Sequence, residues 1–217
     1  MKVTQIKENI YAVGVVDWDL RDFHGYSQVR RGTTYNAYLV IDDKITLFDT
    51  VDDKYRKELM CNIAKVVDPE KIDYIVVNHV EPDHAGALPY VVDKVKPEKI
   101  FTSAMGAKFI ETHFHPKDWP IEAVKNESTL SLGKNTVHFL ETRMLHWPDS
   151  MVSFIPEQKL LISQDAFGQN IVGTDLYDDN IEWNLLRNEM SHYYANIITP
   201  FSAKVPKAIQ KIVDLGW

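Results

Sequence analysis

Two histidines and two carboxylates lie within six residues of the stretch NHVEPDHAGALP, namely His79, Glu81, Asp83 and His84. In an extended chain, side chains two residues apart share a face, so His79 and Glu81 can point at one metal ion. Pro82 breaks the strand, which lets Asp83 and His84 turn toward a second ion at the start of the next helix. The spacing therefore predicts a pair of metal ions. The simpler interpretation is a polar loop in which Asp83 caps a helix.

Two further residues with metal-binding side chains lie at predicted strand ends. His146 follows a strand pattern that ends near Arg143, and Asp165 follows the apolar run KLLISQ. His79 likewise ends the buried run of residues 72–78. Open α/β sheets usually place their ligands beyond the C-terminal ends of strands. We therefore predict that His146 and Asp165 join the metal site, and a carboxylate such as Asp165 can bridge two ions.

The remaining histidine motifs favour structural or surface roles. His113 and His115 lie two apart on a helical pattern, where they face different ways, and His138 lies in a strand pattern. A second Glu-x-x-His motif at 189–192 matches the spacing used by di-iron helical bundles. Because the first such motif contains Pro82 and the chain has many strand patterns, we exclude a bundle.

Composition narrows the class of protein. The net charge is -7 with acids and bases well mixed, whereas a nucleic-acid-binding surface needs a basic patch. No segment approaches the roughly 18 apolar residues of a membrane span, and the N-terminus has no apolar signal core. Cys61 is the only cysteine, so an intramolecular disulfide, an iron–sulfur cluster and a cysteine-based zinc site are excluded. A reducing cytoplasm fits this composition best.

Strand patterns and helix patterns alternate along the chain, with strands leading in each half. Strand composition occurs at residues 10–16, 34–41, 44–50 and 72–79, and a helical pattern occupies 54–67. The second and third of these strands are separated by Asp42 and Asp43 and predict a hairpin. Strands resume near Val124, and the tail is helical. We predict one α/β domain, residues 1–217, with two packed sheets and helices outside, a four-layer sandwich.

The His-x-Glu-x-Asp-His motif, with a later histidine before a PDS turn and an aspartate ending a strand, resembles the metallo-β-lactamase superfamily. Its hydrolases usually carry a second histidine where this chain has Glu81. A carboxylate there adds a hard oxygen donor, which favours iron over zinc. Together with FHGY near the N-terminus and HYYANIITP near the C-terminus, the motif is similar to that of flavodiiron proteins, over essentially the whole chain.

The resemblance implies the αββα sandwich of the metallo-β-lactamase type and a centre of two non-haem irons. It implies six ligands: His79, Glu81 and His146 at one iron, Asp83 and His84 at the other, and Asp165 between them. The implied reaction is reduction of dioxygen to water, of nitric oxide to nitrous oxide, or of both.

Four more residues receive roles from the resemblance. His24, Tyr26 and Tyr194 match positions near the diatomic pocket, where they would donate hydrogen bonds to a bound oxygen species. Ordinary core or surface aromatics are the alternative for each. Asp49 ends the run ITLFD and is expected to support the metal loop through hydrogen bonds.

The chain also departs from the flavodiiron pattern. That family has a seventh ligand, a histidine in an Asp-His-Gly turn, and a flavodoxin-like domain whose FMN serves the other subunit of a head-to-tail homodimer. These 217 residues contain neither, and no histidine follows His192. We expect a fold lacking its last strand and helix, and a chain that binds iron incompletely and turns over little alone. A fragment of a longer chain explains this best; a separate completing chain or a stand-alone relic are the alternatives.

Other functions compete with the reductase, for which rubredoxin is the expected electron donor. A zinc hydrolase of the same superfamily would act on a thioester, lactam or phosphodiester, and Glu81 counts against it. A flavin-free diiron protein that binds or senses oxygen is the third possibility. The identity and stoichiometry of the bound metal discriminate among these functions.

Overall fold

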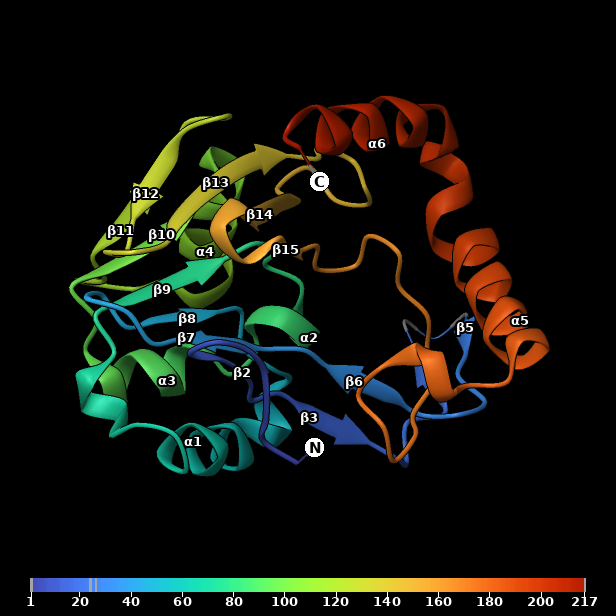
Figure 1. The fold of residues 1–217 in the computed structure, drawn as a ribbon, viewed down its shortest axis with the longest axis horizontal. Helices are drawn as coiled ribbons and strands as arrows, with labels where there is room; N and C mark the ends of the chain where they lie inside the picture. Colours follow the sequence, from blue (N-terminus) through green and yellow to red (C-terminus); the bar gives the residue numbers. More distant parts are fainter. Residues whose placement is uncertain (1, 24, 26, 217) are drawn as a thin grey trace.

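The computed structural model describes residues 2–23, 25 and 27–216 of the chain. These residues form two β-sheets that lie face to face, with helices on the outer side of each (Figure 1). His24 and Tyr26, both expected near the diatomic pocket, lie outside the described residues.

The larger sheet has seven strands, in the order β1-β2-β7-β8-β9-β10-β11. Strands β8 to β11 run parallel, and β1, β2 and β7 join antiparallel at one edge. The strands are β1 Thr4–Lys7, β2 Ile10–Ala12, β7 Tyr38–Val40, β8 Thr46–Phe48, β9 Tyr74–Val77, β10 Lys99–Thr102 and β11 Ile121–Ala123. The pairing of Val40 with Thr46 confirms the predicted hairpin, with a loop longer than the two aspartates.

The smaller sheet is an antiparallel meander of four strands in sequence order. Its strands are β12 Thr129–Ser131, β13 Thr136–Glu141, β14 Met151–Ile155 and β15 Leu160–Ile162. Between β2 and β7 the chain forms two short antiparallel ribbons. They pair β3 Val15–Asp17 with β6 Thr33–Tyr35, and β4 Asp22–Phe23 with β5 Ser27–Gln28.

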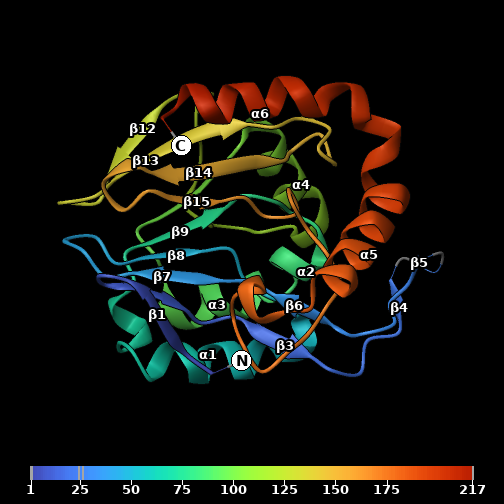
Figure 2. The same cartoon turned by 45° about the vertical axis from the view of Figure 1, so that its right-hand side comes forward.

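Six α-helices occupy the described residues: α1 Arg56–Ala64, α2 Pro82–Ala85, α3 Leu88–Val95, α4 Ala104–Phe114, α5 Trp183–Tyr193 and α6 Val205–Asp214. A π-helical segment, Tyr194–Ile198, and a 3-10 segment, Thr199–Lys204, join α5 to α6. From α5 this helical segment rises along one side of the molecule, and α6 then lies across the outer face of the smaller sheet (Figures 1 and 2). None of the described helices has the length and apolar character needed to cross a bilayer.

Three clusters of buried side chains separate the four layers. Leu59, Leu88 and Ile110 of α1, α3 and α4 pack against the larger sheet. A second core, which includes Phe48 and Phe139, fills the space between the two sheets. A third cluster joins Ile212 of α6 to Leu140 and Val152 on the far side of the smaller sheet. The αββα sandwich predicted from the sequence is therefore confirmed.

The β9–α2 connection presents the first motif at a strand end, as predicted. β9 ends at Val77, His79 follows in the loop, and α2 begins at Pro82. The N-cap residue of α2 is Glu81, and it makes no side-chain capping bond. Asp83 lies inside the helix, so the interpretation of Asp83 as a helix cap is wrong.

A buried polar cluster anchors the β3–β6 ribbon beside this connection. The Asp17 carboxylate is 1% exposed and accepts hydrogen bonds from the Tyr35 hydroxyl at 3.0 Å and from the Lys54 ammonium. It also accepts from the backbone N–H groups of Asp19 and Leu20, each at 3.1 Å. Burial alone would raise the pKa of Asp17, but the hydrogen bonds from Lys54 and Tyr35 outweigh it and lower the pKa.

The lowered pKa of Asp17 predicts loss of stability in acid. A carboxyl whose folded pKa lies below its unfolded value stabilises the fold above the unfolded pKa, about 3.9, and this contribution disappears as the pH falls through the folded pKa. Asp17→Asn should lower the free energy of unfolding by about 1–3 kcal/mol near neutral pH. The difference from the unmodified chain should shrink below about pH 4. Urea denaturation across pH checks this, and a pH-independent difference would contradict it.

Candidate metal centre

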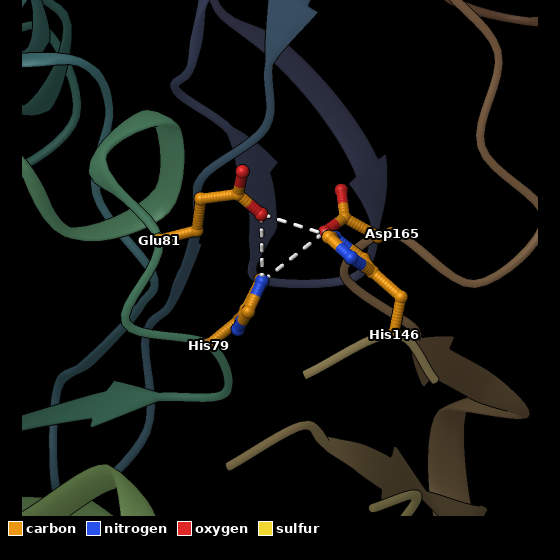
Figure 3. A group of neighbouring side chains, drawn as sticks. All are labelled: His79, Glu81, His146 and Asp165. Carbon is orange, nitrogen blue, oxygen red and sulfur yellow. Dashed lines mark hydrogen bonds and ion pairs between the residues drawn. The ribbon is translucent and has the colours of Figure 1, made fainter. Parts of the chain in front are cut away.

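Four of the predicted ligands, carried by the segments that follow β9, β13 and β15, point toward one another (Figure 3). His79 Nε2 lies 3.0 Å from Glu81 Oε2 and 3.3 Å from Asp165 Oδ2. His146 Nε2 lies 3.0 Å from the same Glu81 oxygen and 3.2 Å from Asp165 Oδ2. The ligand atoms of all four lie within 4.8 Å of one another, close enough to surround one ion.

The other two predicted ligands form a second group that includes Asp165 again. His84 Nε2 lies 3.0 Å from Asp165 Oδ1 and 3.5 Å from Asp83 Oδ2. The ligand atoms of these three residues also lie within 4.8 Å of one another. Asp165 therefore presents one oxygen to each group, the geometry expected of a carboxylate between two ions. The structure brings all six residues together in the division that the resemblance implies.

The clustered imidazoles and carboxylates shift one another's pKa. Burial alone would lower the pKa of His84, but Asp83 and Asp165 raise it. Burial alone would raise the pKa of Asp165, but His84 and His146 lower it. The pKa of Asp83 is raised by its burial and by the charge of Asp165, against the effect of His84. Imidazoles and carboxylates thus shift one another's pKa at positions where a divalent cation would supply positive charge.

An unsatisfied buried atom provides the test of whether metal ions fit. Asp83 Oδ1 is buried and has no hydrogen-bond partner in the described part of the chain. Buried polar atoms of this kind normally find a partner, which here an ion or water would supply. The donors are imidazole nitrogens and carboxylate oxygens, a set that suits iron. The residues therefore fit a pair of iron ions.

Two aspartates hold the first motif in position. Asp149, in the PDS turn, accepts from His79 Nδ1 at 3.1 Å and from the Val80 N–H at 2.8 Å. Asp49 accepts from the backbone and side-chain amides of Asn78 at 2.6 and 3.0 Å, which confirms its expected support of the metal loop. Sequence reasoning missed Asp149. The signal was available, because a carboxylate commonly orients a metal-binding histidine.

Asp149→Asn is expected to weaken metal binding about 10–100-fold. The carboxylate keeps a proton on His79 Nδ1 and leaves Nε2 facing the cluster. Burial alone would lower the pKa of His79, but hydrogen bonds with Asp149 and Glu81 raise it to about 10. Competition titration with a chromogenic chelator measures the change. Asp118→Asn, at an exposed aspartate, is the matched control, and equal affinity in both variants would contradict the role of Asp149.

A cavity of about 970 Å³ reaches the cluster at Asp83, His84 and Asp165. Tyr193 lines it, is 7% exposed, and rests on Gly168, where an added Cβ would lie 3.0 Å from the ring. Burial, followed by the charges of Asp165, Asp83 and Glu81, raises the pKa of Tyr193 well above its usual value. Its hydroxyl therefore stays protonated beside the cluster.

Tyr194, the residue expected in this position, is 43% exposed and does not line the cavity. The helical turn brings its neighbour Tyr193 to the cluster instead, a distinction of about 100° on the helix that a motif cannot resolve. His113 and His115 are exposed and His138 is half-buried in β13, in agreement with structural or surface roles. Glu189 pairs with Arg31 at 3.4 Å, outside both metal groups.

Comparison with known proteins agrees with the fold and the motif. The chain is 55% identical, over its whole length, to 54% of the rubredoxin-oxygen oxidoreductase of Megalodesulfovibrio gigas. It is 42% identical, over 97% of its length, to 53% of the nitric oxide reductase of Moorella thermoacetica. The chain thus spans about half the length of the curated relatives it matches.

Solved structures give the same result. The rubredoxin oxygen:oxidoreductase from Desulfovibrio gigas matches with a TM-score of 0.97 and 55% identity, over 99% of this chain and 53% of that one. The flavodiiron protein from Giardia intestinalis matches with a TM-score of 0.93 and 31% identity, over 97% of this chain and 51% of that one. These matches confirm the resemblance to flavodiiron proteins.

One family model covers most of the sequence. Described as "ODP family beta lactamase", it matches residues 33–214, a range that includes all six clustered residues. The chain therefore belongs to the ODP beta-lactamase family.

Proposed function

We propose that this chain carries the diiron centre of a reductase that converts dioxygen to water, nitric oxide to nitrous oxide, or both. The observation that carries the proposal is the double cluster with its shared carboxylate, in which Glu81 replaces the histidine usual in zinc hydrolases. The names of the relatives support it, since one is a rubredoxin-oxygen oxidoreductase and another a nitric oxide reductase.

The assignment of ligands follows the two groups. His79, Glu81 and His146 would hold one iron, Asp83 and His84 the other, and Asp165 both. Two ferrous ions held there would together supply two electrons for the reduction of a diatomic molecule. The whole chain, residues 1–217, would serve as one diiron domain.

The surrounding residues prepare this site. Asp149 fixes the orientation of His79, and Asp49 fixes the loop that carries it. Tyr193 holds a protonated hydroxyl at the wall of the cavity, where it would donate a hydrogen bond to a bound substrate. We propose His24 and Tyr26 as further hydrogen-bond donors, and Tyr193 in place of Tyr194, which does not line the cavity. Substrate would enter through the cavity, which reaches the cluster from the side of Asp83 and His84.

Electron supply is proposed from the relatives. The name of the Megalodesulfovibrio gigas relative points to rubredoxin as donor, and the name of the Giardia intestinalis relative, a flavodiiron protein, points to a flavin. We propose FMN, carried by protein outside these 217 residues, as the immediate donor within a head-to-tail homodimer. A cytoplasmic location agrees with the lack of a membrane-spanning helix among the described residues.

Anaerobic reconstitution tests the proposal. The chain is loaded with ferrous iron or with zinc in parallel, and bound metal is measured by elemental analysis. Oxygen and nitric oxide consumption are then followed with electrodes in the presence of a chemical reductant. We expect up to two irons per chain and slow consumption of at least one gas, by the iron form and not by the zinc form.

Other outcomes identify the competing functions. Hydrolysis of a thioester, lactam or phosphodiester by the zinc form, with no gas consumption by the iron form, would establish a hydrolase. A reversible oxygen adduct that releases oxygen without forming water would establish an oxygen binder or sensor. Either result would overturn the reductase.

A further inference from the structure

The indole ring of Trp147 packs against two of the clustered histidines. Its centroid lies 5.2 Å from the ring of His79 at an interplanar angle of 87°, and 6.2 Å from the ring of His146 at 73°. The backbone of Trp147 is fixed, because its N–H donates to Ser150 Oγ at 3.2 Å and its carbonyl accepts from the Met144 N–H at 2.7 Å. The ring is thereby held in edge-to-face contact with two proposed metal ligands.

Trp147 has neither of the simpler roles open to a residue at this position. It does not line the cavity that reaches Asp83, His84 and Asp165, so it does not contact the substrate space. Within the described residues its indole N–H donates to no protein group, so it orients no ligand by hydrogen bonding. Trp147 is half-buried, and its indole N–H is not among the fully buried polar atoms without a partner, so the N–H reaches solvent.

A series of rings continues from Trp147 to the surface of α4. Phe109 lies 6.0 Å from Trp147 at 85°, and His113 lies 6.1 Å from Phe109. His113 is exposed, and none of these rings lines the cavity. The cluster therefore has a substrate side, at the cavity, and a separate aromatic side, at α4.

The number of electrons needed to reduce dioxygen suggests a role in electron transfer for the aromatic side of the cluster. Reduction of dioxygen to two waters takes four electrons, whereas two ferrous ions supply two. Tryptophan and tyrosine are the side chains of this kind most readily oxidised by one electron, and electron transfer slows steeply with distance. An indole in contact with two ligand rings is well placed to supply a missing electron.

We propose that Trp147 is an electron-relay residue for the metal cluster, an inference that rests on the proposed reductase function. In the relay step, dioxygen would first oxidise the iron centre. The Trp147 indole would then give one electron to that centre, and its N–H proton would pass to water. A neutral indolyl radical remains. A one-electron donor such as a reduced flavin returns the electron, and water returns the proton, so the ring is restored.

Rapid-freeze electron paramagnetic resonance tests the relay. The chain is loaded with ferrous iron, its metal content is measured, and it is mixed with oxygen without any reductant before freezing. We expect an organic radical whose hyperfine splitting narrows when the tryptophan rings are deuterated. Trp147→Phe should lose the radical, and mass spectrometry should find less oxidised product at this position. Trp183→Phe, at a residue 63% exposed, should keep the radical.

A second variant separates electron transfer from packing. Tyrosine is also oxidisable, so Trp147→Tyr should replace the indolyl signal with a tyrosyl signal, and this variant decides the matter if Trp147→Phe fails to hold iron. No radical in Trp147→Tyr, a radical that persists in Trp147→Phe, or a wild-type radical abolished only by Tyr193→Phe would overturn the relay. Iron binding and oxygen consumption without any radical overturn the relay alone. Failure to bind iron or consume either gas overturns the proposed function as well.

Discussion

Asp165→Asn is expected to abolish binding of a second metal ion and to remove reductase activity. Asp165 is the one residue common to both groups, with Oδ1 3.0 Å from His84 and Oδ2 3.2 Å from His146. An amide retains the shape of the side chain but lacks the negative charge and one of the two oxygens. Loss of a residue that only supports a ligand costs up to about 100-fold in metal affinity, so loss of the shared carboxylate should cost more.

Elemental analysis and gas consumption, measured on the same sample, check this expectation. Asp179→Asn provides a matched control, because it makes the same substitution at an exposed aspartate outside the cluster. Circular dichroism establishes that both variants are folded. A folded Asp165→Asn protein that binds as much iron as the control and consumes gas as fast would show that Asp165 does not bridge the ions.

Glu81→His is expected to shift metal preference from iron toward zinc. The Glu81 carboxylate lies 3.0 Å from both His79 and His146, so an imidazole at this position would remain near the first metal group. The exchange replaces a hard oxygen donor with a nitrogen donor that suits zinc as well as iron, while zinc ranks above ferrous iron in intrinsic affinity. The ratio of bound iron to zinc should fall on the order of tenfold, which corresponds to about 1.4 kcal/mol.

The competition is measured by dialysis against equal concentrations of ferrous iron and zinc without oxygen, followed by elemental analysis. Glu81→Gln serves as the matched variant, since it removes the charge but keeps the oxygen donor. Gas consumption should fall with iron content in Glu81→His. An unchanged metal ratio in that variant would mean that the residue at position 81 does not select the metal.

The candidate ligands could be predicted from the sequence because their residue types and spacing are themselves the signal. Four candidate ligands within six residues, after an apolar run, are a strong signal, and His146 and Asp165 each follow a strand that sequence patterns identify. The four layers also followed from the order of strands and helices. Both predictions depend on patterns among residues that are close together in the sequence, and such patterns can be recognised without knowing the tertiary structure.

Other features required the folded chain. Asp149 is 70 residues from His79 in sequence, and only the packing of the two sheets brings its carboxylate to that imidazole. The choice of Tyr193 over Tyr194 depends on how α5 rotates against the cavity wall. Two adjacent tyrosines have the same composition and nearly the same local pattern, so long-range packing decides which one faces the cluster.

The candidate ligands come from both sheets of the sandwich. His79 and Glu81 follow β9 of the larger sheet, whereas His146 and Asp165 follow strands β13 and β15 of the smaller one. An ion held by all four residues would stabilise the packing of the two sheets against each other. It can bind only when the sheets are packed together, because the ligands come from both. Removal of the metal with a chelator should then speed hydrogen exchange of the backbone amides near the contact between the two sheets, under conditions in which neither sheet unfolds.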